Sequence, residues 1–247
     1  MGKLVPPIFI GGGAANQSIN VTSGSTANTF GPWASFGTLP YSISEIYIFI
    51  DAANSNNGNA LVNIGIGPSG SQTIIIPQIA QVFGGNEAFP TTFFRCRMKL
   101  PAGTEVWAQT SNVTASAALR VSLGVGFSES PGISMITPLG IDLSTSSLIS
   151  QTSGATAGTY GAWVSLGTLA VPGRTLWYTG TRDPSNLTTF NIGVGPSGSQ
   201  SILLGNIPST FNNLIYELEM DCPPGEYWMQ VAGGSSVTTI GGIWIAS

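Results

Sequence analysis

The sequence contains no histidine and very little charge. Its 247 residues include 7 Lys or Arg and 11 Asp or Glu, so 7% are charged, against about 25% in an ordinary globular domain. Without imidazole the chain lacks the usual general base and the commonest metal ligand. Its net charge of -4 provides no polycationic surface, which disfavours binding to a nucleic-acid backbone. We therefore expect no catalytic residue, no bound metal or cofactor and no nucleic-acid partner.

Cysteines and long apolar runs are also scarce. Cys96 and Cys222 are too few for a disulfide scaffold, and we expect both to be buried, reduced thiols. There is no stretch of about 20 apolar residues, so no membrane-spanning helix is expected. The apolar run near the start is broken by Pro6 and Pro7 and is shorter than that of a signal peptide. These features predict a chain made in the cytoplasm, with no membrane partner.

The residues that are abundant predict an ordered, all-β chain. Apolar residues make up 42% of the sequence, which excludes a disordered polypeptide. Runs of β-branched and aromatic residues alternate with polar ones and are separated by clusters of Gly, Pro, Asn and Ser. No segment has a helical period with matching caps. The periodicity is therefore that of short strands joined by tight turns.

An internal repeat is the most informative feature of the sequence. The segments Asn63–Gln72 (NIGIGPSGSQ) and Asn191–Gln200 (NIGVGPSGSQ) are identical at nine of ten positions. Two other pairs of similar segments occur in the same order. They are Thr29–Leu39 with Thr159–Leu169, and Met98–Gln109 with Met220–Gln230. Even the segment LVPPIFI before the first repeat resembles ITPLGID before the second. We interpret this pattern as duplication of a unit of roughly 120 residues, a common domain size.

Each repeat is predicted to contain about eight strands. In the first repeat they are expected near residues 17–23, 30–39, 44–51, 60–66, 72–77, 91–100, 104–110 and 116–126. In the second they are expected near residues 145–152, 160–169, 174–181, 187–194, 200–205, 213–221, 226–232 and 237–246. Eight strands in such a length are typical of a β-sandwich, and in particular of a jelly roll. The predicted organisation is an N-terminal arm (1–15), a first sandwich (16–127), a linker (128–138) and a second sandwich (139–247).

One predicted strand changes the sign of its charge between the repeats. Alternation places three cations on the outer face of the first copy and three acids at matching positions of the second. These residues are Arg95, Arg97 and Lys99, matched by Glu217, Glu219 and Asp221. A solvated outer face that resists edge pairing would explain them. A second interpretation is a complementary contact, in which the basic face of one unit meets the acidic face of another and fixes its orientation.

The first fifteen residues form a Pro- and Gly-rich arm that cannot fold on its own. Its apolar side chains are Leu4, Val5, Ile8, Phe9 and Ile10. Docking on a neighbouring subunit would remove them from water, at about 25 cal/mol per Å² of apolar surface. We expect this arm to be a protein-binding segment, unless it is simply disordered.

Three patterns suggest chemistry but fit it poorly. The repeated decapeptide satisfies GxGxxG, yet a dinucleotide-binding loop must open a helix, whereas this one continues into strand-like sequence. Glu217 and Glu219 would lie about 7 Å apart on one strand face, as in an inverting glycosidase, but the matching residues of the other repeat are cationic. A calcium site built from backbone carbonyls and one carboxylate, at Asp51 or Asp183, stays open.

The tryptophans have two interpretations. Trp33 and Trp163, and likewise Trp107 and Trp228, match across the repeat and are expected in the sandwich cores. Trp177, which aligns with Tyr47, and Trp244 are either core residues or surface aromatics that stack on sugar rings. The second possibility defines Tyr47, Trp177 and Trp244 as candidate carbohydrate-binding residues.

The duplicated IGxGPSGSQ hairpin, the Gly/Ser/Thr/Asn-rich all-β composition and the apolar arm resemble those of virion structural proteins of tailed bacteriophages. That group includes small β-sandwich head decoration (cement) proteins and fibre or tail accessory domains. The resemblance implies symmetric, often trimeric, homo-oligomers on a capsid lattice, partners among other virion proteins, and assembly in the host cytoplasm without a signal peptide. We therefore expect a non-enzymatic capsid decoration protein. The alternative is a carbohydrate- or receptor-binding module of a fibre or tail.

Overall fold

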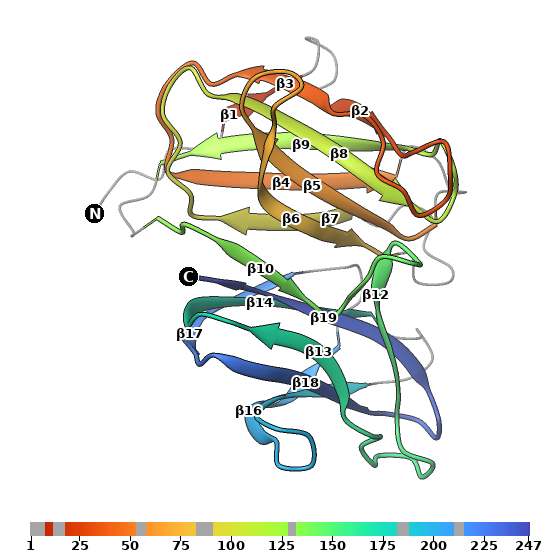
Figure 1. Ribbon diagram of the computed structural model, residues 1–247. Coiled ribbons are helices and arrows are strands. Elements are labelled where there is room, and N and C mark those ends of the chain that lie inside the picture. The colour runs from red at the N-terminus through yellow and green to blue at the C-terminus, as the bar shows by residue number, and fades with distance from the viewer. Residues whose placement is uncertain are drawn as a thin grey trace. The chain divides into compact units, whose positions relative to one another are not determined.

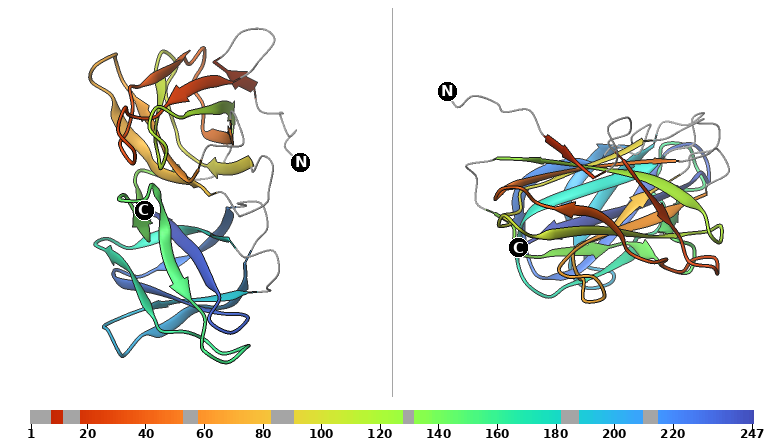
Figure 2. Two further views of the ribbon diagram at one scale, coloured as in Figure 1. Left: turned by 90° about the vertical axis from the view of Figure 1, so that its right-hand side faces the viewer. Right: turned by 90° about the horizontal axis from the view of Figure 1, so that it is seen from above.

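The computed structural model describes residues 8–11, 18–52, 58–82, 91–127, 132–181, 188–209 and 215–247. Every regular element within these ranges is a β-strand, and the coloured parts of the ribbons contain no helix (Figure 1, Figure 2). No helix in the described residues is therefore long and apolar enough to cross a membrane. The prediction of an all-β protein is confirmed.

The described residues divide into two compact units. The first comprises residues up to Gln81 together with Thr91–Ile136, and the second comprises Thr137–Ser247 and Val82. The strands of the first unit are β1 (Ile8–Ile10), β2 (Ile19–Thr22), β3 (Ala34–Thr38), β4 (Glu45–Ala52), β5 (Ala60–Ile66), β6 (Thr73–Gln81), β7 (Thr91–Cys96), β8 (Glu105–Asn112) and β9 (Ala118–Gly126). Those that follow are β10 (Ile136–Leu139), β11 (Ile141–Asp142), β12 (Ser147–Thr152), β13 (Val164–Leu169), β14 (Gly173–Thr181), β15 (Thr189–Val194), β16 (Ser201–Pro208), β17 (Tyr216–Cys222), β18 (Gly225–Ala232) and β19 (Thr238–Ala246).

Each unit is a jelly-roll sandwich of two antiparallel sheets. In the first unit one sheet has the order β2-β9-β4-β7, with β1 also paired to β9, and the other has the order β3-β8-β5-β6. The second unit has the orders β12-β19-β14-β17 and β13-β18-β15-β16. In both units, strands that are consecutive in the chain mostly alternate between the two sheets, which is the connectivity of a jelly roll. All sixteen predicted strands overlap one of these sixteen strands.

The core of each unit lies between its two sheets. In the second unit the buried cluster takes Leu176 and Ile243 from one sheet and Ile192 and Tyr227 from the other. In the first unit the fully buried side chains likewise come from both sheets, for example Ile48 of β4 and Ile64 of β5. Because side chains alternate along a strand, this burial leaves every second residue on an outer face.

The segment before each eight-strand set is a short strand at an equivalent place. β1 pairs antiparallel with β9, and β10 pairs with β19, so each lies along the last strand of its set. Gly11 follows β1 with a φ of 80°, and Gly140 follows β10 with a φ of 78°. A β-carbon on Gly11 would collide with Phe36, and one on Gly140 with Leu166, the residue that matches Phe36 in the second repeat. These two strands were not expected from the sequence, which placed them in an arm and mainly in a linker.

Candidate functional site

The repeated decapeptide forms the β5–β6 hairpin and the β15–β16 hairpin. The amide of Ser71 donates to the carbonyl of Pro68 at 3.0 Å, and that of Ser199 to the carbonyl of Pro196 at 3.0 Å. Both turns continue directly into strands, β6 and β16. A dinucleotide-binding loop would instead open a helix whose N-terminus receives the phosphates. The prediction of a structural turn is therefore confirmed.

The glycines of this motif lie against tryptophan rings. A β-carbon on Gly65 would be 2.7 Å from the ring of Trp33, and one on Gly193 would be 2.9 Å from the ring of Trp163. No side chain larger than hydrogen fits at such a distance without displacing the ring. The first glycine of the motif is thus explained by a tryptophan from elsewhere in the same repeat.

A second tryptophan in each unit anchors the turn by a hydrogen bond. Trp107 Nε1 donates to the carbonyl of Gly67 at 2.7 Å, and Trp228 Nε1 donates to the carbonyl of Gly195 at 2.8 Å. These two glycines have φ values of 114° and 125°, in the region that favours glycine. The second glycine of the motif is therefore explained by its backbone conformation and by the indole donor.

The expectation that the four matched tryptophans fill the cores is wrong. Trp33, Trp107 and Trp163 are only half-buried, and Trp228, which is 9% exposed, lies between the core residues Tyr227 and Met229 and therefore on the outer face. On β8 the buried neighbours of Trp107 are Val106 and Ala108, so alternation directs the Trp107 side chain to the outer face. The core assignment failed because a large aromatic side chain can be covered by a hairpin as well as by the opposite sheet.

The asparagine that opens the motif holds a bulge in the neighbouring strand. Asn63 Oδ1 accepts the amide of Gln78 at 2.7 Å, and Asn191 Oδ1 accepts the amide of Asn206 at 2.8 Å. Gln78 and Asn206 have φ values of 54° and 56°, a conformation that costs free energy unless it is supported. The motif is therefore engaged in the same internal contacts in both units.

The basic strand has the predicted alternation. Phe94, Cys96 and Met98 are buried, whereas Arg95 and Arg97 are half-buried and Lys99 is exposed. Strand β7 ends at Cys96, so only the first of the three cations lies within it.

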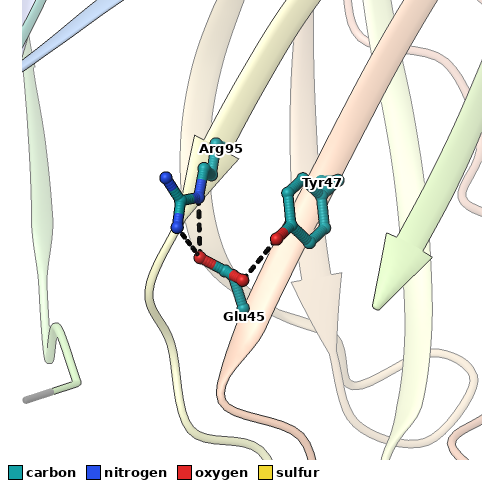
Figure 3. A network of polar contacts seen from close by, with 3 residues as sticks. All are labelled: Glu45, Tyr47 and Arg95. Atoms are coloured by element: carbon teal, nitrogen blue, oxygen red, sulfur yellow. Dashed lines mark hydrogen bonds and ion pairs between the residues drawn. The ribbon is translucent and has the colours of Figure 1, made fainter. Parts of the chain in front are cut away.

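Arg95 belongs to a polar network that the sequence analysis missed. Its Nε donates to Glu45 Oε1 at 2.6 Å, its Nη2 forms an ion pair with the same oxygen, and the Tyr47 hydroxyl donates to Glu45 Oε2 (Figure 3). Glu45 is 4% exposed, whereas the Arg95 side chain is 40% exposed. The guanidinium carbon also lies 5.9 Å from the centroid of the Tyr47 ring, within the range of a cation–π contact.

The network accounts for a buried carboxylate on the outer side of the sheet. A buried charge needs a partner and hydrogen bonds to offset its desolvation, and Glu45 has Arg95 and Tyr47 on its two oxygens. Burial raises the pKa of Tyr47 above its ordinary value, and the hydrogen bond to Glu45 raises it further. Glu45 stands directly before the apolar run Ile46–Ile50 of β4, and an acid at that place was the only signal in the sequence.

The acidic strand β17 occupies the place of β7 in the second unit. Trp177 is the cross-strand partner of Glu217, as Tyr47 is of Arg95, which reproduces the alignment of the two repeats. Glu219 and Asp221 are exposed and Glu217 is half-buried. The oppositely charged triplets therefore start from equivalent register positions.

Two of the three candidate carbohydrate-binding aromatics are not exposed. Trp177 and Trp244 are directly opposed on β14 and β19 and are 1% and 0% exposed. Stacking on a sugar ring requires a free ring face, which neither side chain presents in the structure. Tyr47 is half-buried, and it stacks at 6.3 Å on Phe93.

The apolar arm is only partly visible. Leu4 and Val5 lie outside the described residues. Ile8–Ile10 pair with Leu123–Val125 of the chain's own β9, and Phe9 contacts Phe49 with ring centroids 5.7 Å apart. Ile8, Phe9 and Ile10 thus lie against the first unit of their own chain.

Two further expectations from the sequence concern bound metal ions and the two cysteine thiols. No group of three or more His, Cys, Asp or Glu that could hold a metal ion occurs among the residues that can be placed. Asp51 Oδ2 lies 3.9 Å from Arg120 Nη2. Asp183 lies outside the described ranges. Neither Cys96 nor Cys222 is part of a disulfide, and both are buried, as predicted. Burial raises the pKa of the Cys222 thiol to about 11, with a smaller contribution from Asp221.

Comparisons with known proteins give weak likenesses only. No protein-family model matches the chain, and no curated protein matches it. The N-terminal CBM22-1-CBM22-2 tandem domain of Paenibacillus barcinonensis Xyn10C aligns with 13% identity over 93% of this chain and 87% of that one, at a TM-score of 0.27. The PBSX exported protein XepA aligns with 12% identity over 98% of this chain and 86% of that one, at a TM-score of 0.30. The VP2 subviral particle of infectious bursal disease virus aligns with 11% identity over 93% of this chain and 70% of that one, at a TM-score of 0.27. Scores this low support no argument about function.

Proposed function

We propose that this protein is a non-enzymatic structural protein of a bacteriophage particle, a capsid decoration protein that bridges and stabilises neighbouring subunits. The observation that supports this most is the repeated motif, whose side chains are used for the same internal contacts in both units. Two similar rigid sandwiches in one chain suit a protein that contacts more than one neighbour.

Bridging stabilises a particle through surface buried between subunits, at about 25 cal/mol per Å² of apolar area. The partners would be the major capsid protein or other virion subunits, together with further copies of this chain. Leu4 and Val5 are the arm residues proposed to dock, because Ile8–Ile10 already lie on β9. The exposed charges Lys99, Glu219 and Asp221 would orient the contact. Arg95 contributes less, since Glu45 holds it.

The test compares the rupture temperature of particles with and without the protein. We expect particles that lack it to break at a lower temperature, and purified protein to restore them. Lys99→Glu should weaken this rescue, because it reverses an exposed charge of the basic set. Arg174→Glu is the matched control, since Arg174 is exposed and belongs to neither charged set. Equal rupture temperatures with and without the protein would refute the proposal.

The carbohydrate- or receptor-binding alternative retains one of its three aromatics, Tyr47. Its hydroxyl is bound to Glu45 and its ring is flanked by Arg95 and Phe93, so a sugar would have to use the remaining surface of the ring. This alternative predicts glycan binding that Tyr47→Ala abolishes. An array that shows no binding by the intact protein would remove it.

A further inference from the structure

A groove lies between the repeated hairpin of the first unit and the turn that precedes β8. Its volume is about 630 Å³, which is within the range of small-molecule sites and much larger than a single ion requires. Its lining includes Ile66, Pro68, Ser71 and Thr73 from the hairpin, and Thr104 and Glu105 from the turn and the start of β8. All of these residues belong to the first unit. The groove is therefore large enough for a small organic ligand.

The carboxylate of Glu105 is the only charged group among the residues that line the groove. Glu105 is half-buried, and its side chain has neither a hydrogen bond nor an ion pair within the part of the chain that the structure describes. Its backbone carbonyl accepts the amide of Gly67 at 3.2 Å, so the main chain is fixed while the carboxylate stays available. A partly desolvated carboxylate is stabilised by hydrogen-bond donors, which a ligand in the groove would supply.

Three hydroxyl groups complete the polar lining. Ser71 and Thr73 are exposed, and Thr104 Oγ1 donates to a backbone carbonyl of its own turn at 2.8 Å, which leaves its lone pairs as acceptors. A carboxylate only accepts, whereas a hydroxyl both donates and accepts. The groove thus suits a ligand that carries several hydroxyl groups, since an ammonium group would use the acceptors alone. Ile66 and Pro68 provide apolar surface for the C–H groups of such a ligand.

The second unit repeats the polar residues of the groove. Ser199, Ser201 and Glu226 match Ser71, Thr73 and Glu105, while Thr104 has no counterpart. The local backbone is equivalent, because the amide of Gly195 donates to the carbonyl of Glu226 at 3.0 Å. Ser165 Oγ donates to Glu226 Oε1 at 3.1 Å, which engages one of the two carboxylate oxygens. The two repeats differ in sign on β7 and β17 but share this acid, which indicates a role that both units need.

We propose that the groove binds a saccharide, with Glu105 accepting hydrogen bonds from its hydroxyl groups, and that Glu226 has the same role in the second unit. Hydrogen bonds to an ionised acceptor are stronger than those between neutral groups, so the acid is the main polar contact. The hydroxyls of Ser71 and Ser199 add further bonds to the same ligand. This binding goes beyond the proposed structural role and does not depend on it, and its site is separate from Tyr47.

The test is saccharide binding by the purified full-length chain. The probe is an array of neutral mono- and oligosaccharides of glucose, galactose, mannose and N-acetylglucosamine, and titration calorimetry then measures the Kd of the best ligand. We expect Glu105→Gln/Glu226→Gln to weaken binding at least tenfold, because glutamine keeps the shape of the side chain but not its charge. Asp51→Asn is the control, since it removes a carboxylate charge outside the groove, and it should keep the Kd within twofold.

Circular dichroism and a melting curve establish that each variant is folded. If the glutamine pair does not fold, Ser71→Ala/Ser199→Ala should weaken binding at least threefold, since both serines are exposed. A natural chain that binds no saccharide of the array with a Kd below about 1 mM overturns the proposal. So does a folded glutamine pair with unchanged Kd, or binding that Tyr47→Ala abolishes instead. None of these results bears on the rupture temperature of particles.

Discussion

At the scale of single residues, Gly65 and Gly193 occupy equivalent places beneath a tryptophan ring. Glycine is the only residue type that leaves room for the tryptophan ring so close to the strand at these positions. The asparagine two positions earlier is likewise committed, because its side chain satisfies the amide of a bulged residue. Near-identity of the decapeptide in both repeats is therefore a consequence of packing and hydrogen bonding.

Gly193→Ala tests this account of the motif. The added methyl group would lie 2.9 Å from the Trp163 ring, so we expect a loss of about 1–3 kcal/mol in the free energy of unfolding. Gly205→Ala is the control, because the nearest atom to its β-carbon would be 3.4 Å away, and it should change stability by less than about 0.5 kcal/mol. Urea denaturation measures both. Equal stability of the two variants would show that the ring does not restrict Gly193.

The buried thiol of Cys222 predicts a loss of stability in alkali. Its pKa in the folded chain is about 11 against an ordinary 9.0, so the folded state holds the proton more tightly than the unfolded state. The stabilisation is complete below about pH 9 and is lost as the pH rises towards 11. Between pH 8 and 10.5 the free energy of unfolding should fall by about 1–2 kcal/mol from this group.

Cys222→Ala separates this contribution from others. The variant should be less stable at pH 8, because it leaves a small cavity, but its further loss between pH 8 and 10.5 should be smaller than that of the natural chain. Tyr178, whose pKa burial raises to about 12, acts in the same direction at higher pH and is unchanged by the substitution. An identical pH dependence in the two proteins would contradict the assignment to Cys222.

At the scale of elements, the Glu45 network connects β4 to the edge strand β7. Glu45 is at the first residue of β4 and Arg95 is near the end of β7. Both carboxylate oxygens have a donor, so the network resembles a clamp between neighbouring strands. Its counterpart in the second unit is different, because β17 has Glu217 where β7 has Arg95.

Glu45→Gln should lower the free energy of unfolding by about 1–2 kcal/mol. The substitution removes the charge that Arg95 and Tyr47 solvate, and the partial exposure of Arg95 limits the effect. Arg120→Gln breaks a looser pair with Asp51, at 3.9 Å between exposed side chains, and should cost less than about 0.5 kcal/mol. A double-mutant cycle of Glu45→Gln with Arg95→Gln measures the coupling, and a coupling near zero would contradict the clamp.

The sequence was sufficient to predict most elements and few of the contacts. Side chains alternate between the two faces of a strand, and turn residues bound it. The local sequence pattern therefore locates β4 and β14 without tertiary information. β1 and β10 were missed because strands of three or four residues owe their structure to the neighbouring strand β9 or β19. Glu45 was missed because its partner is 50 residues away. The burial of Trp177 and Trp244 also depends on tertiary packing, which alternation along one strand does not determine.

At the scale of the whole molecule, the chain consists of two jelly-roll units with the same strand order. The surfaces proposed for contact with other subunits are the exposed charges Lys99, Glu219 and Asp221 and the arm residues Leu4 and Val5. A protein of this kind contributes to a particle through its number of copies and its contacts. The number of copies per particle is therefore the property on which the proposed structural role most depends.

The measurement that tests this most directly is the copy number of the chain in purified phage particles, obtained by quantitative mass spectrometry against the major capsid protein. The account predicts a fixed ratio that is retained through density-gradient purification and high salt. Particles in which the chain is absent, or present only in traces that salt removes, would contradict a structural role in the shell.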